Sequence, residues 1–491
     1  MKKIVIIFIL SIGIISCTSD FEELNKDPLA ANKVPTPSLL TASLQDLIGI
    51  NSGLGYNKTF MFYSQQWAQR ETTSRSLYDI ASTSGDWSAW YSNGLPELVN
   101  IIELNSGEDK DSYSVYGKNE NQIAVAMILK AWAFHNITDT WGNIPYSETF
   151  NAEISSPKYD KQEDIYPALI QELKSAAAMI DVSSSGFTSG DLMYDGDMTK
   201  WKAFANSLRA RIAMRMSEVN PGLAQAEVAD ALGSLVFTSN FDNAKVAFQN
   251  EEANANPLYI EFLTQSWTFV SESFTDLMNS YGSGTATNPS DPRIEKYAAP
   301  NVDGDYIGFP YGLTTSETFD YAIDERSLPS EATRAIDSQS YIMTYSELLF
   351  IKAEAEQRGW FGTVGDAAIS YEQAINASME QWDVNNADIT TYLALADVLY
   401  DDANWRKMIG EQKYISLYTL GSNAWSELRR LDFPELIFPA DAVATTNSTA
   451  TEIPRRFFYA SSEASVNGTN LEQAINDMGG DTFSTRMWWD Q

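Results

Sequence analysis

The chain has 491 residues, a formal net charge of −33 and one cysteine. So strong a negative charge argues against a nucleic-acid partner, because phosphates are bound through Lys and Arg, and it disfavours adsorption to anionic lipid surfaces. One cysteine excludes an intramolecular disulfide and any multi-cysteine metal site.

Residues 1–16 have the pattern of a bacterial lipoprotein signal peptide. Lys2 and Lys3 precede an apolar run, residues 4–15, that is too short to span a membrane as a helix but suits a secretory signal. The sequence Ile-Ile-Ser-Cys then resembles a lipobox, in which the thiol carries the lipid. We predict cleavage before Cys17, lipidation of Cys17 and a mature domain of residues 17–491. The alternative is a buried N-terminal strand with an ordinary core cysteine.

Acidic residues follow the cysteine directly. Asp20, Glu22 and Glu23 resemble the signal that sends some lipoproteins to the outer face of the outer membrane, and they are equally compatible with a solvated tether. We therefore predict a lipid-anchored outer-membrane protein that faces the cell exterior. Because the chain exceeds the usual single-core limit of about 250–300 residues, we expect either two domains or a helical repeat array.

Apolar residues recur at helical spacing in segments that come in pairs. From Tyr341 to Glu356, for example, Ile342, Tyr345, Leu349 and Ala353 would share one face. Paired helices with small residues at the crossings are typical of tetratricopeptide-like hairpins, which stack to bury a continuous core. The sequence therefore predicts a mainly α fold with a scaffold of helical hairpins. The predicted pairs are residues 122–180, 201–232, 341–382 and 404–431.

Three other segments, residues 70–85, 280–334 and 438–470, are rich in Ser, Thr, Gly, Asn, Pro and Asp. Loops of this length in a compact protein are usually functional or disordered, so we expect a long, irregular, loop-rich region that carries the ligand surface. Aromatic rings beside polar side chains are typical of sites for polar ligands. The middle segment holds Tyr281, Tyr306, Phe309, Tyr311, Phe319 and Tyr321.

Five aromatic residues are the candidates for ligand contact. Tyr78 and Trp87 come from the early loop, and Tyr281, Tyr306 and Tyr311 come from the middle loop. Burial in the core is the alternative for each of them.

The sequence gives little support for catalysis or a cofactor. The one histidine, His135, lies in a helical apolar run, where a core role is expected. Multi-histidine zinc sites and phosphate-binding glycine motifs are absent from the sequence. Asn301–Asp305 starts like a calcium-binding loop, but Tyr306 and Gly312 stand where that loop needs Gly and Glu, so an Asx-rich turn is expected, with a looser calcium site on these oxygens as the alternative. We predict no catalytic residues, no metal site and no cofactor.

Several short sequence motifs, here called phrases, together resemble the SusD/RagB family of nutrient-binding outer-membrane lipoproteins, in particular its SusD-like branch. Each phrase is weak alone, but their order and combination, from Cys17 to the end, are specific. The phrases are Phe21–Pro28, Ile137–Asp139, Trp141–Glu148, Gly196–Trp201, Asp291–Arg293, Ala353–Trp360, Ala424–Arg430, Ile453–Arg456, Gly479–Asp481 and Trp488–Asp490.

This resemblance implies a cell-surface protein that captures oligosaccharides, or in some members peptides, and delivers them to a TonB-dependent, SusC-like transporter without acting as an enzyme. It also implies that the shared phrases, with Trp360, Trp425, Trp488 and Trp489, form scaffold rather than ligand surface. Oligosaccharide is the slightly favoured ligand.

Two other functions fit the sequence. A lipid-anchored glycoside hydrolase would need only two suitably spaced carboxylates among the 66 acidic residues. A helical-repeat scaffold that binds only protein would need no small ligand at all.

Overall fold

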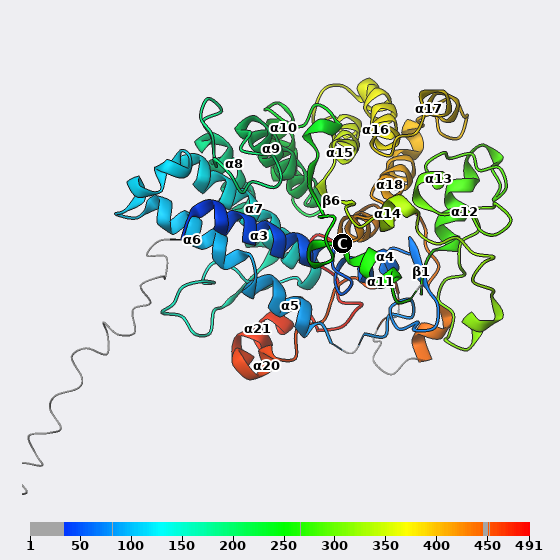
Figure 1. Cartoon of the computed structure of the whole chain (residues 1–491), viewed down its shortest axis with the longest axis horizontal. Coiled ribbons are helices and arrows are strands. Elements are labelled where there is room, and N and C mark those ends of the chain that lie inside the picture. The colour runs from blue at the N-terminus through cyan, green and yellow to red at the C-terminus, as the bar shows by residue number, and fades with distance from the viewer. Residues whose placement is uncertain (1–33, 81, 266, 445–449, 451) are drawn as a thin grey trace, which may run out of the picture.

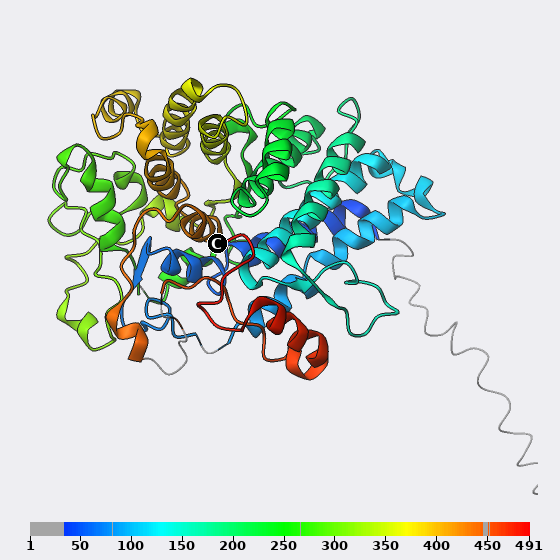
Figure 2. The ribbon, with the colours of Figure 1, turned by 180° about the vertical axis from the view of Figure 1, so that it is seen from behind.

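The structure is a computed structural model that describes residues 34–80, 82–265, 267–444, 450 and 452–491. The predicted signal peptide, Cys17 and the acidic cluster behind it therefore lie outside the described residues. Figure 1 shows helices in pairs along one side of the molecule, with irregular segments and short helices on the other, and Figure 2 shows the same arrangement from behind. Within the described residues, no helix has the length and apolar character needed to cross a membrane.

The predicted helical pairs form the scaffold. Each pair packs together, and α8 on α9, α9 on α15 and α15 on α18 join one pair to the next. Local sequence signals set the ends of these helices. At the start of α9, the Asp197 carboxylate accepts hydrogen bonds from the backbone amides of Thr199 and Lys200. Helix α10 begins at Pro221 and ends before Gly233. The pairs are α7 (Asn119–Trp141) with α8 (Gln162–Met179), α9 (Met198–Arg215) with α10 (Pro221–Leu232), α15 (Tyr345–Gln357) with α16 (Ala367–Gln381), and α18 (Trp405–Ser416) with α19 (Gly421–Leu431).

The start of the third pair corrects the sequence prediction. The expected helix from Tyr341 begins only at Tyr345, because Gln339–Met343 forms strand β6, antiparallel to β4 (Ala244–Ala247). Thr344 separates the two elements, and its hydroxyl accepts from the Glu347 amide at 3.1 Å, which caps the helix.

Further elements surround this scaffold. One hydrophobic core lies mainly among α3, α6–α9 and the C-terminal segment, and a second lies mainly among α12 and α15–α18. The remaining helices are α3 (Thr36–Asn51), α4 (Asn57–Tyr63), α5 (Ser84–Ser92), α6 (Leu95–Ser106), α11 (Pro257–Phe262), α12 (Glu272–Ser280), α13 (Ile294–Tyr297), α14 (Glu331–Arg334), α17 (Asn386–Leu393), α20 (Glu463–Val466) and α21 (Gly468–Met478). Two more antiparallel pairs join β1 (Trp67–Gln69) to β5 (Thr268–Val270) and β2 (Ile144–Pro145) to β3 (Tyr159–Asp160).

The three predicted loop-rich segments contain mostly turns and short helices. The third segment is irregular over a shorter stretch than expected. Its end belongs to α21, which starts at Gly468 because Leu471 and Ala474 give that stretch an apolar face buried in the core. Residues 445–449 and 451 of the same segment lie outside the described part of the chain.

Buried ion pairs hold the helical pairs together. Glu427 of α19 accepts from Arg215 of α9 at 2.6 Å, Lys413 of α18 at 2.8 Å and Arg430 at 2.7 Å, and Arg430 also contacts Glu354 of α15 at 2.6 Å. Burial raises the pKa of Glu427, but the surrounding cations outweigh it and hold the pKa well below its ordinary value. Three of these residues, Glu354, Glu427 and Arg430, belong to the phrases Ala353–Trp360 and Ala424–Arg430, so these two phrases are part of the scaffold.

The four tryptophans of those phrases differ in burial. Trp425 and Trp489 are fully buried, and the Arg429 guanidinium lies over both rings, 3.4 Å and 4.7 Å from their centroids. Trp360 and Trp488 are half-buried and pack against the first core. The expectation that they act as packing residues agrees with these contacts.

Candidate functional site

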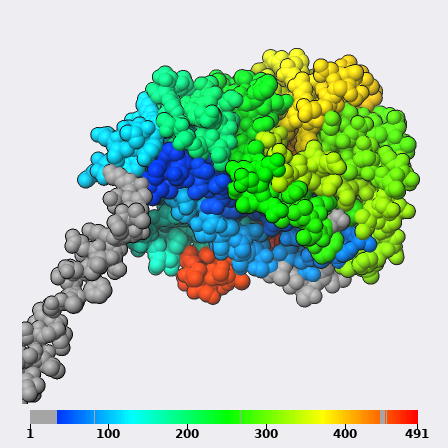
Figure 3. Space-filling model, viewed as in Figure 1, coloured from blue at the N-terminus to red at the C-terminus, as the bar shows by residue number. Residues whose placement is uncertain are grey.

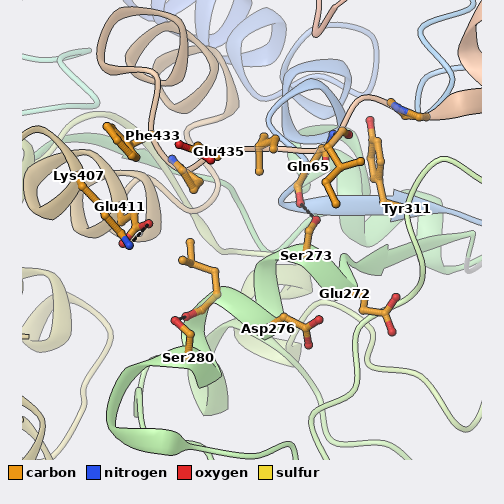
Figure 4. A pocket seen from close by; sticks show the side chains of 15 residues that line it. Gln65, Glu272, Ser273, Asp276, Ser280, Tyr311, Lys407, Glu411, Phe433 and Glu435 are labelled. Carbon is orange, nitrogen blue, oxygen red and sulfur yellow. Dashed lines mark hydrogen bonds and ion pairs between the residues drawn. The ribbon is translucent and has the colours of Figure 1, made fainter. Parts of the chain in front are cut away.

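A hollow with polar and aromatic walls lies between α12, α18 and the segment after α19, and Tyr311 and Pro439 of the loop-rich segments also line it. Its volume is about 700 Å³, within the range of ligand sites in proteins. We call it the loop pocket. Figure 4 shows its side chains projecting from α12, from α18 and from the segment that follows α19. It is lined by Gln65, Glu272, Ser273, Asp276, Leu277, Ser280, Tyr311, Lys407, Glu411, Phe433, Pro434, Glu435, Leu436, Ile437 and Pro439.

Tyr311 is the predicted residue that lines this pocket. Its ring is half-buried, and its hydroxyl donates to the Phe62 carbonyl at 2.6 Å, which fixes the ring. The next residue, Gly312, has φ of 76°, and a side chain there would meet Pro439 at 2.5 Å, so glycine lets two loops touch. That contact brings Tyr311 beside the segment that contains the exposed Ile437.

Tyr78 and Tyr281 lie behind the pocket wall. Tyr78 is fully buried; its hydroxyl accepts from the Gln65 amide at 3.2 Å, and burial raises its pKa to about 12. Tyr281 is also buried and donates to the Glu411 carboxylate at 2.9 Å. Both tyrosines therefore position residues that line the loop pocket, and neither presents a ring face to solvent in this structure.

Tyr306 and Trp87 lie elsewhere. Tyr306 is half-buried and lines a smaller hollow of about 300 Å³, which shares Glu272, Asp276 and Ser280 with the loop pocket. Trp87 is buried in α5, with the ring of Trp141 centred 5.3 Å away. Two of the five candidates thus flank α12, two support the pocket from behind, and Trp87 packs in the core.

Phe319 is an aromatic of the middle loop that is absent from the five candidates. Its side chain is 58% exposed, and the Arg70 guanidinium lies 5.0 Å from its ring centroid. The loop is held in place because the Thr318 hydroxyl accepts from the Glu71 amide at 3.3 Å. The sequence marks this loop as rich in aromatics, but no local pattern separates its exposed ring from its buried ones.

The charge of the loop pocket is mainly negative. Glu272, Asp276, Glu411 and Glu435 line it with one cation, Lys407, whose Nζ lies 3.9 Å from Glu411. Burial, and then the charge of Asp276, raise the pKa of Glu272. Burial also raises the pKa of Glu411. Carboxylates and the Gln65 amide offer hydrogen bonds to hydroxyl and N–H groups, while Tyr311 and Phe433 offer apolar ring surface.

The two other sequence candidates for chemistry have structural roles. His135 is buried in α7, 3.4 Å from Asp139, and burial lowers its pKa to about 4. The Asn301 side chain accepts from the amides of Asp303 at 3.0 Å and Asp305 at 2.8 Å, which is an Asx-type turn. Among the described residues, no group of three or more His, Cys, Asp or Glu side chains could hold a metal ion.

Paired helices that support a pocket between α12, α18 and the segment after α19 define a mainly α-helical protein built on helical hairpins. The chain belongs to the SusD-like family described as "Starch-binding associating with outer membrane", whose model matches residues 28–460. This match confirms the family resemblance seen in the sequence.

Solved structures resemble most of the chain. A chitin-binding protein has 26% identity and a TM-score of 0.79, covering 93% of this chain and 99% of its own. A chitin-binding SusD homologue from Flavobacterium johnsoniae has 26% identity and a TM-score of 0.75, and the match covers 92% of this chain and 98% of the homologue. A SusD homologue from Bacteroides uniformis shares the fold, with 23% identity and a TM-score of 0.77. The match covers 92% of this chain and 99% of that homologue. Among curated proteins, none matches this chain.

Proposed function

We propose that this protein binds nutrient oligosaccharides at the cell surface, in the loop pocket, and passes them to a TonB-dependent, SusC-like transporter. The observation that carries the proposal is the pocket itself: about 700 Å³, with the fixed ring of Tyr311 beside carboxylate and amide groups. Rings stack on the apolar faces of sugars, and carboxylates and amides bind their hydroxyl groups. The family description and the two chitin-binding structures support a glycan as the ligand.

Chitin oligosaccharides are the first ligands to test, with maltooligosaccharides second and peptides as the alternative cargo. Partly open stacking sites of this kind give micromolar to millimolar affinity, about −8 to −4 kcal/mol. Such weak binding suits a protein that must release its ligand to a channel.

The lipid anchor is part of the proposal. The Ile-Ile-Ser-Cys sequence and the family's association with the outer membrane support attachment through Cys17, with the soluble domain facing outward. Mass spectrometry of the native protein should find an acylated Cys17, and Cys17→Ala should release the protein from the membrane fraction. A large β-barrel should co-purify with the anchored wild type. An unmodified amino terminus, or a cytosolic wild type, would contradict the anchor.

One observation favours a glycoside hydrolase as a second candidate. Glu272 and Glu411 both line the loop pocket and both have raised pKa values, as a general acid requires. The test is to incubate the protein with a panel of oligosaccharides and peptides, and to analyse both binding and products. Binding with the ligand recovered intact supports the transport protein. Products that disappear in Glu272→Gln or Glu411→Gln support the hydrolase.

A protein-only scaffold gives a third pattern in the same experiment. In that case no glycan or peptide of the panel binds, while a stable protein complex still forms.

A further inference from the structure

A second pocket lies beside strand β6, and we call it the strand pocket. Its volume is about 340 Å³, near the lower end for ligand sites. β6 and α14 lie on the near side in Figure 1, and the space-filling view of that face is hollowed between its green and yellow-green parts. The residues that line the loop pocket and the strand pocket, all in the described part of the chain, do not overlap.

Four aromatic side chains form part of its wall, and one of them, Trp67, is buried. Trp382, Tyr341 and Phe248 line the pocket, and all three are half-buried. The Trp382 ring is fixed by Tyr297, whose ring centroid is 5.0 Å away at an interplanar angle of 76°. The Lys245 ammonium lies 5.7 Å from the Tyr341 ring centroid. Because the rings of Trp382 and Tyr341 already have these contacts, a ligand that stacks on them costs little side-chain entropy.

Polar groups complete the pocket. The Asn256 amide donates to the Thr333 carbonyl at 2.9 Å, so it stiffens the wall. Gln339 is exposed and Gln381 is half-buried, and both line the pocket with side chains that can donate and accept. Lys296 and Asp383 add one charge of each sign, in contrast to the acidic loop pocket. Flat rings, carboxamides and balanced charge favour an uncharged ligand with many hydroxyl groups.

We propose that the strand pocket is a second carbohydrate-binding site, which takes a short segment of a neutral glycan. The aromatic wall receives the apolar face of a sugar ring, and Gln339, Gln381 and the two charged side chains bind its hydroxyl groups. Two sites in one chain would raise the apparent affinity for a long polymer over that for a short oligosaccharide.

The test uses the full mature chain labelled with 5-fluorotryptophan and observed by ¹⁹F NMR, with Trp382→Phe to assign the Trp382 resonance. Chitin and maltooligosaccharides are titrated into Tyr311→Ala, in which the loop pocket is weakened. The expected result is a saturable shift of the Trp382 resonance in that background. Adding Gln339→Ala with Gln381→Ala should weaken this response at least about tenfold, whereas Gln473→Ala, on the exposed face of α21, should leave it unchanged.

The outcomes separate the two sites. If a glycan binds the wild type but leaves the Trp382 resonance unmoved, or if Tyr311→Ala alone abolishes the response, the strand pocket is not a second site while the loop pocket stands. If peptides move the resonance and glycans do not, the carbohydrate assignment is overturned. If the Trp382 response persists while the loop pocket binds no glycan, the proposed function of the loop pocket fails instead.

Discussion

Replacing Glu427 with Gln should strongly destabilise the helical scaffold. Glu427 is the carboxylate shared by Arg215, Lys413 and Arg430, at 2.6 to 2.8 Å. When Glu427 loses its charge, Arg215 still pairs with Asp139 at 3.3 Å and Arg430 still pairs with Glu354. Lys413, in contrast, has no other carboxylate within 4.0 Å in the described part of the chain. Breaking a buried pair costs about 3–5 kcal/mol, out of the roughly 5–15 kcal/mol by which proteins are stable.

The pH dependence of this loss has a defined sign. Burial lowers the pKa of Lys413, whereas the negative charge of Glu427 raises it. Glu427→Gln removes that charge, so the pKa of Lys413 falls further. At a pH between the pKa of Lys413 in the folded state and its ordinary value of 10.5, Lys413 is protonated only in the unfolded state. Because unfolding then takes up a proton, raising the pH in this range stabilises the folded state. The deficit of Glu427→Gln relative to wild type should therefore shrink as the pH rises from neutral toward 10.5.

Urea denaturation of both proteins at several pH values measures the deficit. Glu218→Gln is the matched control, because Glu218 pairs with Arg358 and Arg406 at the surface, where its side chain is 37% exposed, and its loss should cost under about 1 kcal/mol. If Glu427→Gln costs no more than Glu218→Gln, or if its deficit grows as the pH rises, the buried charges around Glu427 do not stabilise the scaffold in this way.

Three further predictions concern the pocket and the local structure. Asp276→Asn should lower the pKa of Glu272, because the charge of Asp276 raises it; an NMR titration with no downward shift would contradict this. Gly421→Ala should lower the free energy of unfolding, measured by urea denaturation, by about 1–3 kcal/mol, since its Cβ would meet backbone at 2.7 Å, whereas Gly222→Ala, in open space, should not destabilise. Thr344→Ala should cost about 1 kcal/mol through loss of the α15 cap, and Thr344→Ser should restore most of it; equal losses would argue against capping.

The helical scaffold is readable from the sequence because its signals are local. Helical periodicity, the cap at Asp197 and the Pro221–Gly233 limits all act within a few residues, and the predicted pairs agree with the structure there. Strand β6 was missed because Tyr341 and Ile342 fit the helical spacing of the segment that follows. What makes that stretch a strand is its partner β4, about a hundred residues earlier in the chain, and no local pattern reports such pairing.

The site could be predicted only as a region. Tyr78, Tyr311 and Phe319 have the same kind of sequence surroundings, yet one is buried, one half-buried and one exposed. Contacts between distant segments decide the difference, such as the Tyr311 hydroxyl on the Phe62 carbonyl and the approach of Gly312 to Pro439. Of the residues that line the loop pocket, only Ser280, Tyr311 and Pro439 lie in the three predicted segments, because α12, α18 and the segment after α19 supply most of the wall.

Glycan binding in the loop pocket depends, in this proposal, on the ring of Tyr311. The most direct measurement is the equilibrium affinity of one bound oligosaccharide for wild type, Tyr311→Ala and Trp87→Phe, each shown to be folded by its thermal melt. The account predicts that Tyr311→Ala weakens binding at least about tenfold, while the buried Trp87→Phe stays within about twofold of wild type. Wild-type affinity in folded Tyr311→Ala, or a selective loss in Trp87→Phe, would contradict it.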